Sequence, residues 1–433
     1  MNKKTVWALL TILALRLVFH ALYVPVYEGP DEPFHLARIV SFVDGSLAEG
    51  WRGETVSPLI VGSVESHPCC NDLARAFGCR PFGEGSAEFN ILDLDTARQS
   101  SEITANYERH QPPIYYMLGA VVLSGSSALF PSAISEAPSF RLLFGRLFSL
   151  ALVLIALIGP MRSLANHYGN SWYAALILVL FVPGASESLV RCANDSAIFF
   201  WSALLMWALF RKAESRYLIA MAMIGPMIKL TALPIVGIVV VWAWFNRPRW
   251  HALMIASSSS LIVPLQWFRG FRWGGTVELN YDSQAAAEPL QDFALGFVRS
   301  SYTFLKTTVW LGEWSFFRAP LWVLIVASLF LVIVILSLRF QEKPTVGFAP
   351  HAAGLVLAIA ATSYWFISHR AFWGQWGGVG GWYAWGWYPW AAVLAGDFVG
   401  IHRSRRSLIF GGGVILLLII NIAWFTLAHR LYS

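Results

Sequence analysis

Long, nearly uninterrupted apolar runs recur from one end of the chain to the other. A run of about 20 apolar residues can cross the hydrocarbon core of a bilayer as a helix. A membrane barrel would instead show short segments in which apolar and polar residues alternate, and these runs are continuous. The sequence therefore predicts an all-α, polytopic membrane protein. The runs lie near residues 6–27, 114–131, 141–160, 171–190, 193–210, 217–245, 251–268, 319–338, 351–368, 383–400 and 407–428.

The composition also favours a bilayer environment. Of the 433 residues, 57% are hydrophobic and 13% are charged, a balance that a water-soluble domain of this size does not need. We assign the net charge of +6 to cytoplasmic loops under the positive-inside rule, so we expect no nucleic-acid partner. The first run lacks a small-x-small cleavage site, which favours a retained helix over a secretion signal.

The basic residues orient the chain across the membrane. With the N-terminal Lys pair inside, the polar stretch 28–113 becomes a large first periplasmic loop, which we expect to carry interfacial helices. The later basic clusters fall inside only if one of the three runs between residues 111 and 191 does not cross, and the run from Ile114 is our candidate. The expected bundle has about eleven transmembrane helices and lies in a bacterial inner membrane.

The run 217–245 is too long for one ordinary span, and Pro226, Lys229 and Pro234 interrupt it. Proline inside a helix removes a backbone hydrogen bond, so we expect two helices joined by a tight turn around Lys229. A charge at membrane depth is costly, which makes Lys229 a functional candidate unless its side chain extends to water.

Three of the four cysteines, Cys69, Cys70 and Cys79, cluster in the first outer loop. In an oxidising periplasm Cys79 can pair with Cys69 or Cys70, and the spacing leaves that choice open. A zinc site with His67 is the alternative, but three thiols at this spacing match no usual ligand set. A structural disulfide is therefore favoured.

The segment 28–38, directly after the first run, reads Glu-Gly-Pro-Asp-Glu-Pro-Phe-His-Leu-Ala-Arg. Pro33 suits the first turn of a helix, with Asp31 or Glu32 as its cap and a face beginning at Phe34 that lies on the membrane. Capping alone would explain both carboxylates. Catalysis is the other interpretation, and these residues by themselves favour capping.

Two further polar positions adjoin later apolar runs. His110 precedes a Pro-Pro pair, and packing explains the rigid prolines without asking for a histidine. Arg191 begins the segment Arg-Cys-Ala-Asn-Asp-Ser between two runs, where Asn194 and Asp195 can cap the next helix and can also bind a ligand.

Four motifs occur in order over residues 1–240: Asp-Glu-Pro-x-His from Asp31, His-x-Pro-Pro-x-Tyr-Tyr from His110, Arg-x-x-Asn-Asp from Arg191 and Lys-x-x-x-x-Pro from Lys229. Together they resemble the GT-C glycosyltransferases, which include protein O-mannosyltransferases, the lipid A aminoarabinose transferase and less characterised bacterial members. The resemblance is strongest to those bacterial members. It implies a GT-C type bundle in which residues 1–245 form the catalytic transmembrane module and residues 246–433, with the periplasmic loop 269–318, form a C-terminal module.

The later part resembles the family less sharply. The stretch around Glu313 resembles an aromatic-glycine element of the bacterial relatives. The segments that begin at Gly381 and Trp387 resemble a late Gly-Arg-Tyr segment, but Trp stands where Arg is expected. We therefore assign no phosphate-binding role to these two segments.

The resemblance implies transfer of a sugar, with inversion, from a polyprenyl-phosphate donor to a periplasmic acceptor, which can be an envelope glycan, lipopolysaccharide or a protein. Such a reaction needs a base for the acceptor hydroxyl and a cation for the departing phosphate. By motif, Asp31 would be the catalytic carboxylate, and the adjacent Glu32 is the second expected catalytic residue. The expected substrate-binding residues are His110, Arg191, Asn194, Asp195, Lys229 and Glu313.

We expect no metal cofactor, because Lys229 or Arg191 supplies a cation. Mg²⁺ or Mn²⁺ held by Asp31, Glu32 and Asp195 is the alternative. Rival functions are a carrier or flippase for lipid-linked saccharides, which would need polar residues through several spans, and an O-antigen ligase or polymerase. No Walker, Gly-x-Ser-x-Gly or His-Glu-x-x-His motif supports ATP-driven transport, serine hydrolysis or zinc proteolysis.

Overall fold

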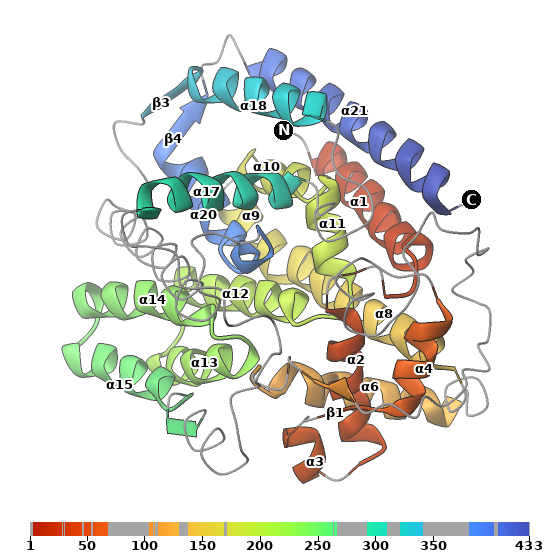
Figure 1. Cartoon of the computed structure of the whole chain (residues 1–433). Helices are drawn as coiled ribbons and strands as arrows, with labels where there is room; N and C mark the ends of the chain where they lie inside the picture. The colour runs from red at the N-terminus through yellow and green to blue at the C-terminus, as the bar shows by residue number, and fades with distance from the viewer. Residues whose placement is uncertain are drawn as a thin grey trace.

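The computed structural model describes residues 3–27, 29, 31–45, 47–52, 55–67, 104–106, 108, 111–129, 137–168, 171–262, 264–265, 292–309, 321–340, 381–401 and 406–432. Over these residues the chain is almost wholly helical, as predicted (Figure 1). The α-helices are α1 (Lys3–Tyr23), α2 (Glu32–Val43), α3 (Leu47–Arg52), α4 (Pro58–Ser66), α6 (Ile114–Leu129), α8 (Pro138–Ala156), α9 (Arg162–Tyr168), α10 (Ser171–Val179), α11 (Pro183–Val190), α12 (Asp195–Phe210), α13 (Ser215–Ile228), α14 (Ala232–Asn246), α15 (Arg249–Ser260), α17 (Phe293–Val309), α18 (Leu321–Ile335), α20 (Tyr388–Phe398) and α21 (Arg406–Tyr432).

Short elements complete the described fold. A π-helical segment, η2 (Leu157–Met161), contains Pro160 and joins α8 to α9, because proline cannot supply the regular helical hydrogen bond. A 3-10 turn, η4 (Gly381–Ala384), precedes α20. The strands β1 (Thr55–Val56) and β2 (Thr104–Ala105) pair antiparallel, and so do β3 (Leu338–Phe340) and β4 (Val399–Ile401).

Among the described residues, three helices are long and apolar enough to cross a bilayer: Lys4–Tyr23, Pro138–Asn166 and Ile409–Leu427. A fourth candidate is the pair α11 and α12, which meet at an angle of 96° and together have the apolar length of one span. The expectation of about eleven spans is therefore wrong for the described part of the chain, which offers three, or four if the bent pair is one span.

The other described apolar runs form helices that are too short. The helices α6, α13 and α14 contain 16, 14 and 15 residues. A 15-residue helix rises about 22 Å, short of a hydrocarbon core of roughly 30 Å. The turn predicted around Lys229 is confirmed, since α13 ends at Ile228 and α14 begins at Ala232, and this turn divides one long run into two short helices. The run 351–368 lies outside the described residues.

The sharpest break among the candidate spans lies between α11 and α12, at Arg191–Asn194. The run from Ile114, expected to be the one that does not cross, forms the continuous helix α6. Its path relative to a bilayer stays a prediction. The break between α11 and α12 coincides with the Arg-x-x-Asn-Asp motif. The backbone therefore leaves helical geometry at the residues of that motif.

The helix α2 is not interfacial. All nine residues from Glu32 to Val40 are buried inside the protein, Phe34 among them. The helix packs against α6, α3, α8 and α4, which cover it on several sides. The expectation of a membrane-lying face is wrong, because that apolar face is covered by neighbouring helices of the same chain.

One hydrophobic core includes residues from both expected modules. Trp385 and Trp390, from the C-terminal part, belong to the same buried cluster as the helices α8, α12 and α14. Trp390 Nε1 donates to Ser202 Oγ at 2.8 Å, and this hydroxyl donates to the carbonyl oxygen of Gly386. The division after residue 245 stays a prediction.

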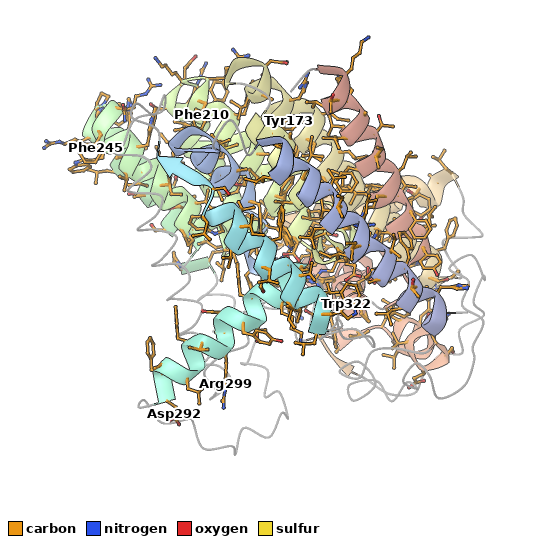
Figure 2. The ribbon with its side chains drawn as sticks, turned by 90° about the horizontal axis from the view of Figure 1, so that it is seen from above. Tyr173, Phe210, Phe245, Asp292, Arg299 and Trp322 are labelled. Atoms are coloured by element: carbon orange, nitrogen blue, oxygen red, sulfur yellow. The ribbon has the colours of Figure 1, made fainter. Side chains whose placement is uncertain are left out.

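Two of the C-terminal helices, α18 and α21, lie on the outside of the bundle. The helices α18 and α21 lie side by side (Figures 1 and 2) and share a smaller apolar cluster that includes Val323, Leu416 and Trp424. Asp292, the residue just before α17, lies at the end of that helix that is farther from Trp322 of α18 (Figure 2). The helix α21 is joined to α11 through Trp424, whose indole donates to Glu187 Oε1 at 2.5 Å.

Candidate functional site

Asp31 stands at the start of α2 in an unusual backbone conformation. Its φ is 65° and its ψ is 3°, the left-handed region that L-residues other than Asn, Asp and Gly rarely adopt. It occupies the N-cap position, yet its side chain makes no capping hydrogen bond; its carbonyl oxygen accepts from the amides of Phe34 and His35. The half-buried carboxylate is therefore not used to cap the helix. Capping was the structural role that the sequence offered for this residue.

Glu32, the next residue, has a different environment. Arg146 donates to both of its oxygens, Nε to Oε1 at 2.9 Å and Nη2 to Oε2 at 2.6 Å. The amide of Cys192 donates to Oε1 at 3.0 Å and the amide of Gly29 to Oε2 at 3.3 Å. Arg146 also donates to the carbonyl oxygens of Val24 and Pro25. We call this group, Glu32 with Arg146 and the two amides, the Glu32 clamp.

The Glu32 clamp is a structural element. Both clamp side chains are buried, and every oxygen of the carboxylate has two donors, so little capacity remains for a substrate. The contacts join the start of α2 to α8 and to the break between α11 and α12. A Cβ at Gly29 would lie 2.7 Å from Cδ of Glu32, so the turn also needs glycine at this close approach.

A second carboxylate, Glu108, lies beside Asp31. Asn106 positions it: Asn106 Nδ2 donates to the carbonyl oxygen of Phe34 at 3.0 Å, and Asn106 Oδ1 accepts from the amide of Glu108 at 3.0 Å. Pairing of β2 with β1 holds the chain just before Asn106. Glu108 is 5% exposed, and its Oε2 has no hydrogen-bond partner within the part of the chain that the structure describes.

His35 completes a group of three. Ligand atoms of Asp31, His35 and Glu108 all lie within 4.8 Å of one another. His35 Nδ1 is 3.9 Å from Glu108 Oε2 and 2.8 Å from the hydroxyl of Tyr116. Asp31 and His35 are four residues apart, which brings them to one side of the first turn of α2. We call Asp31 and Glu108 the carboxylate pair.

The electrostatics of the carboxylate pair favour a shared proton near neutral pH. Burial raises the pKa of Asp31 to about 7, and the negative charge of Glu108 adds to the rise, while Arg191 and Lys229 oppose it. Burial raises the pKa of Glu108 to about 7 as well, against the opposing charges of Lys229 and Arg38. Two desolvated carboxylates this close do not both ionise readily, so the pair takes up and releases protons as a unit.

Asp195 is held between two cations. Arg191 Nη2 donates to its Oδ2 at 2.5 Å, and Lys229 Nζ donates to its Oδ1. Asp195 is fully buried and Lys229 is 5% exposed, so the lysine side chain does not extend to water. The Lys229 turn, between α13 and α14, thus meets the break between α11 and α12 at a single carboxylate. The charges of Arg191 and Lys229 also act on Asp31, which places these two groups in the same neighbourhood.

Asn194 does not cap α12. It occupies the N-cap position, but its side chain makes no capping bond; Nδ2 donates to Gln111 Oε1 at 3.2 Å and to the carbonyl oxygen of Ile228 at 3.4 Å. The expectation that this residue caps the helix is wrong at the side-chain level. Asn194 instead connects the segment before α6 to the turn that carries Lys229.

Arg38 fixes that same segment from the side of α2. Its Nη1 donates to the carbonyl oxygens of Glu108, at 3.0 Å, and of Gln111. Its guanidinium lies 4.3 Å from the centre of the Tyr116 ring, a cation–π contact. From the late aromatic segment, Tyr383 brings its ring to 5.5 Å from Lys229 Nζ. Residues from the first, second and last thirds of the chain therefore meet here.

Of the residues named from sequence, Asp31, Arg191, Asn194, Asp195 and Lys229 come together in one region. Glu32 lies next to it but is engaged in the clamp. His110 and Glu313 lie outside the described residues, as do Cys69, Cys70 and Cys79; the cysteine that is described, Cys192, is buried and not in a disulfide.

The alternative metal ligands expected from sequence do not form a group. Glu32 is occupied by Arg146 and Asp195 by Arg191 and Lys229, so neither carboxylate is available to join Asp31 around an ion. Within the described residues, the ligand types that do lie together are those of Asp31, His35 and Glu108.

Sequence reasoning missed Glu108 and Arg38, and it did not assign a role to His35. His35 carried a usable signal, because a spacing of four residues from Asp31 puts both on one helix face. Glu108 gave little signal in the sequence, because it is one acidic residue in a long polar stretch. Only the contacts of Asn106 and Arg38 bring it to α2.

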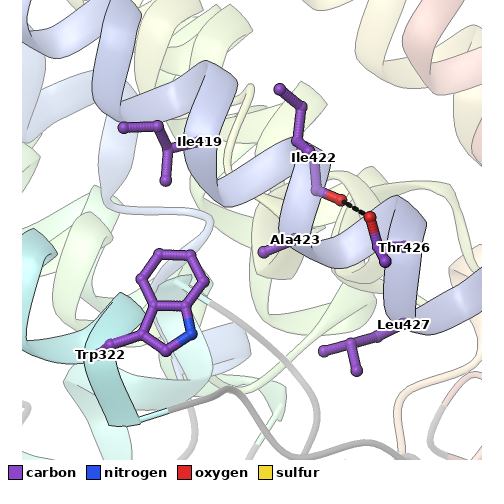
Figure 3. A pocket seen from close by; sticks show the side chains of 6 residues that line it. All are labelled: Trp322, Ile419, Ile422, Ala423, Thr426 and Leu427. Carbon is purple, nitrogen blue, oxygen red and sulfur yellow. Dashed lines mark hydrogen bonds between the residues drawn. The ribbon is translucent and has the colours of Figure 1, made fainter.

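A groove with a volume of about 400 Å³ lies elsewhere, between α18 and α21 (Figure 3). Its lining is apolar apart from Thr426, whose hydroxyl donates to the carbonyl oxygen of Ile422 in its own helix. The groove has no titratable lining residue, so it offers no acid, base or metal ligand.

Compared with family models, with curated proteins and with solved structures, the chain gives no match. The site therefore has to be interpreted from its own geometry. The site combines an acidic pair whose pKa values are raised to about 7 by burial, two buried cations on a shared aspartate, and a histidine beside the acids. Such a combination suits a proton transfer close to a group that carries negative charge.

Proposed function

We propose that this protein is a membrane-embedded glycosyltransferase that transfers a sugar, with inversion, from a polyprenyl-phosphate donor to an acceptor hydroxyl. We further propose that it resides in a bacterial inner membrane with this site on the periplasmic side. The acceptor would be an envelope glycan, lipopolysaccharide or a protein. The candidate spans support a membrane location, and the order of the four sequence motifs supports the reaction.

One observation carries the proposal: the carboxylate of Asp31 is not used by its helix and stands with Glu108 among buried cations. A left-handed backbone is uncommon at residues other than glycine, although aspartate tolerates it, and such conformations concentrate at functional sites. A carboxylate with a pKa of about 7 is a better proton acceptor than an ordinary aspartate, because the efficiency of a general base rises as its pKa approaches the working pH.

The reaction would proceed in one displacement. The acceptor oxygen forms a bond to the anomeric carbon of the sugar, and the bond between that carbon and the phosphate oxygen breaks with its electron pair staying on the phosphate. The acceptor's proton passes to the Asp31 carboxylate. The phosphate leaves as polyprenyl phosphate, and the attack from the opposite side inverts the anomeric centre.

Arg191 and Lys229 have the charge to stabilise that leaving phosphate. Asp195 binds both cations at once and so sets their position. A preorganised cation in a water-poor site stabilises developing negative charge without having to reorganise during the reaction. Asp195 is accordingly a positioning residue in this proposal, and Glu32 is a structural one.

The test uses the purified full-length protein in lipid nanodiscs with a polyprenyl-phosphate sugar and an envelope extract as the acceptor source. Release of polyprenyl phosphate is measured by mass spectrometry, so the acceptor need not be known. For Asp31→Asn we expect release to fall by roughly 10²–10⁴-fold, the usual contribution of a general base.

Glu214→Gln is the matched control, because Glu214 is an exposed carboxylate that pairs with Arg216 at the surface. It should release polyprenyl phosphate at the wild-type rate. A folded Asp31→Asn variant with undiminished release would show that Asp31 is not the base. If the wild-type protein instead moves the lipid-linked sugar across vesicle membranes and forms no product, the protein is a carrier rather than a transferase.

A further inference from the structure

We propose that Asp31, His35 and Glu108 bind a divalent cation, and that Mn²⁺ is the ion that suits them. The inference rests on the proposed function for its purpose, which is to hold the donor's phosphate: one oxygen of Asp31 would bind the ion and leave the other to accept the acceptor's proton. The binding itself can be measured without any transfer reaction. This ligand set differs from the Asp31, Glu32 and Asp195 set that the sequence offered as an alternative.

The three ligands come from two separate segments that the fold holds against each other. Asp31 and His35 lie on one side of the first turn of α2, and Glu108 follows β2. Asn106 and Arg38 bind the Glu108 segment to α2 at three points, through the carbonyl oxygens of Phe34, Glu108 and Gln111. A group whose ligand atoms lie within 4.8 Å of one another can close around one ion with small side-chain rotations.

Glu108 supplies the independent indication of a ligand. It is 5% exposed, and its Oε2 accepts no hydrogen bond within the described part of the chain. This atom is 3.9 Å from His35 Nδ1, inside the three-residue group. Buried carboxylate oxygens in proteins are normally paired or coordinate a metal, and an ion between the three residues would satisfy this one.

The charges of the region leave room for such an ion. Asp31, Glu108 and Asp195 carry three negative charges when ionised, and Arg38, Arg191 and Lys229 carry three positive charges, so the six groups sum to zero. A donor phosphate is an anion and would be repelled by the carboxylate pair. A divalent ion on that pair changes the sum to +2 and makes the site attractive to phosphate.

The donor atoms select the ion. Two carboxylates and one imidazole form a mixed oxygen and nitrogen set, which suits Mn²⁺ or Zn²⁺ better than Mg²⁺, an ion that prefers oxygen ligands alone. Three protein ligands leave coordination positions for a substrate or water, as in catalytic rather than structural metal sites. Of the two ions, Mn²⁺ is the one that accepts the larger share of oxygen ligands and binds phosphate readily.

The hydroxyl of Tyr116 stands at His35 Nδ1, at 2.8 Å. It can orient the imidazole, as hydrogen bonds to metal-binding histidines commonly do, or it can compete with an ion for this nitrogen. In either case Tyr116→Phe removes no metal ligand. This variant should still bind the ion, within about tenfold of the wild-type affinity.

The experiment titrates Mn²⁺ into chelator-treated, full-length protein in nanodiscs and follows the loss of the free-ion signal by electron paramagnetic resonance. We expect about one Mn²⁺ per chain, with affinity at least tenfold weaker in Glu108→Gln and in His35→Gln. Glu214→Gln, the exposed carboxylate, is the matched control and should bind like the wild type.

A second measurement needs no variant to fold. Pulsed resonance on wild-type protein with bound Mn²⁺ should show coupling to one imidazole nitrogen, from His35. Absence of stoichiometric binding, or bound Mn²⁺ without nitrogen coupling, overturns the proposed site. Transfer that proceeds undiminished in protein shown to bind no Mn²⁺ overturns the metal site and leaves the transferase proposal standing. Protein that binds Mn²⁺ but transfers sugar to no acceptor overturns the transferase proposal and leaves the metal site standing.

Discussion

Asp31 and Glu32 are neighbours in the chain, yet the regions around them differ in every respect that matters for chemistry. The oxygens of Glu32 receive four donors, two from Arg146 and two from backbone amides. The carboxylate pair of Asp31 and Glu108 lies near the cations Arg38, Arg191 and Lys229, and one of its oxygens has no donor among the described residues. A carboxylate whose hydrogen bonds are all satisfied stabilises a fold, whereas one left short of donors can bind or take up a proton.

The largest expected effect is on the Glu32 clamp. Arg146→Met leaves a buried glutamate without its cation, and removing one partner of a buried ion pair typically costs about 3–5 kcal/mol. We expect that loss in the free energy of unfolding, measured by denaturant titration in detergent micelles. The double variant Arg146→Met with Glu32→Gln should recover part of it, and a single variant as stable as the wild type would show that the clamp is not structural.

Lys229→Met should have an intermediate effect on both properties. Asp195 keeps Arg191 but loses its second cation, and a hydrogen bond between charged groups contributes about 1.5–3 kcal/mol. The free energy of unfolding should fall by about that amount, and release of polyprenyl phosphate should fall by at least tenfold because a cation at the leaving group is gone. Undiminished release in a folded variant would remove Lys229 from the reaction.

Two substitutions at Asp31 should differ slightly in stability. Asparagine tolerates the left-handed backbone and alanine does not, so Asp31→Ala should be less stable than Asp31→Asn by about 1 kcal/mol. Both variants lose the carboxylate, so both should lose transfer. The free energies of unfolding of the two variants provide the measurement, and equal values would mean that the left-handed conformation does not persist in solution.

The smallest effect is expected at the surface. Arg216 pairs with Glu214 at 2.9 Å, but the two side chains are 71% and 67% exposed. Water and salt screen such pairs, so Arg216→Met should change the free energy of unfolding by no more than about 0.5 kcal/mol. A loss as large as that of Arg146→Met would mean that burial does not set the contribution of these two ion pairs to stability.

The sequence predicted the helices and the turn at Lys229 correctly, but it did not predict the number of spans or the burial of α2. Apolar runs identify helices, and the interrupting Pro226 and Lys229 located a turn that the structure contains. The number of spans in the described part of the chain was overestimated because hydropathy does not register where a helix ends, so the runs that form the 14- and 15-residue helices α13 and α14 were counted as crossings. The burial of α2 was missed because its covering helices come from distant parts of the chain.

The site was predicted unevenly for a related reason. The motifs marked Asp31, Arg191, Asn194, Asp195 and Lys229, which the fold brings into one region, but gave Asp31 and Glu32 the same status. The donor that separates them, Arg146, is 114 positions from Glu32 in the sequence. Glu108 entered the site through the contacts of Asn106 and Arg38, which no local pattern reveals.

By itself the sequence determined that the chain is helical, apolar enough for a bilayer, broken at Lys229 and rich in charged residues at a few fixed places. The tertiary structure decided which of those charged side chains have hydrogen-bond partners and opposite charges beside them. Helix formation depends on residues three and four apart, so it can be inferred from a linear pattern. The state of a buried carboxylate depends on how many donors and charges lie within a few ångströms of it, and those come from segments far apart in the chain.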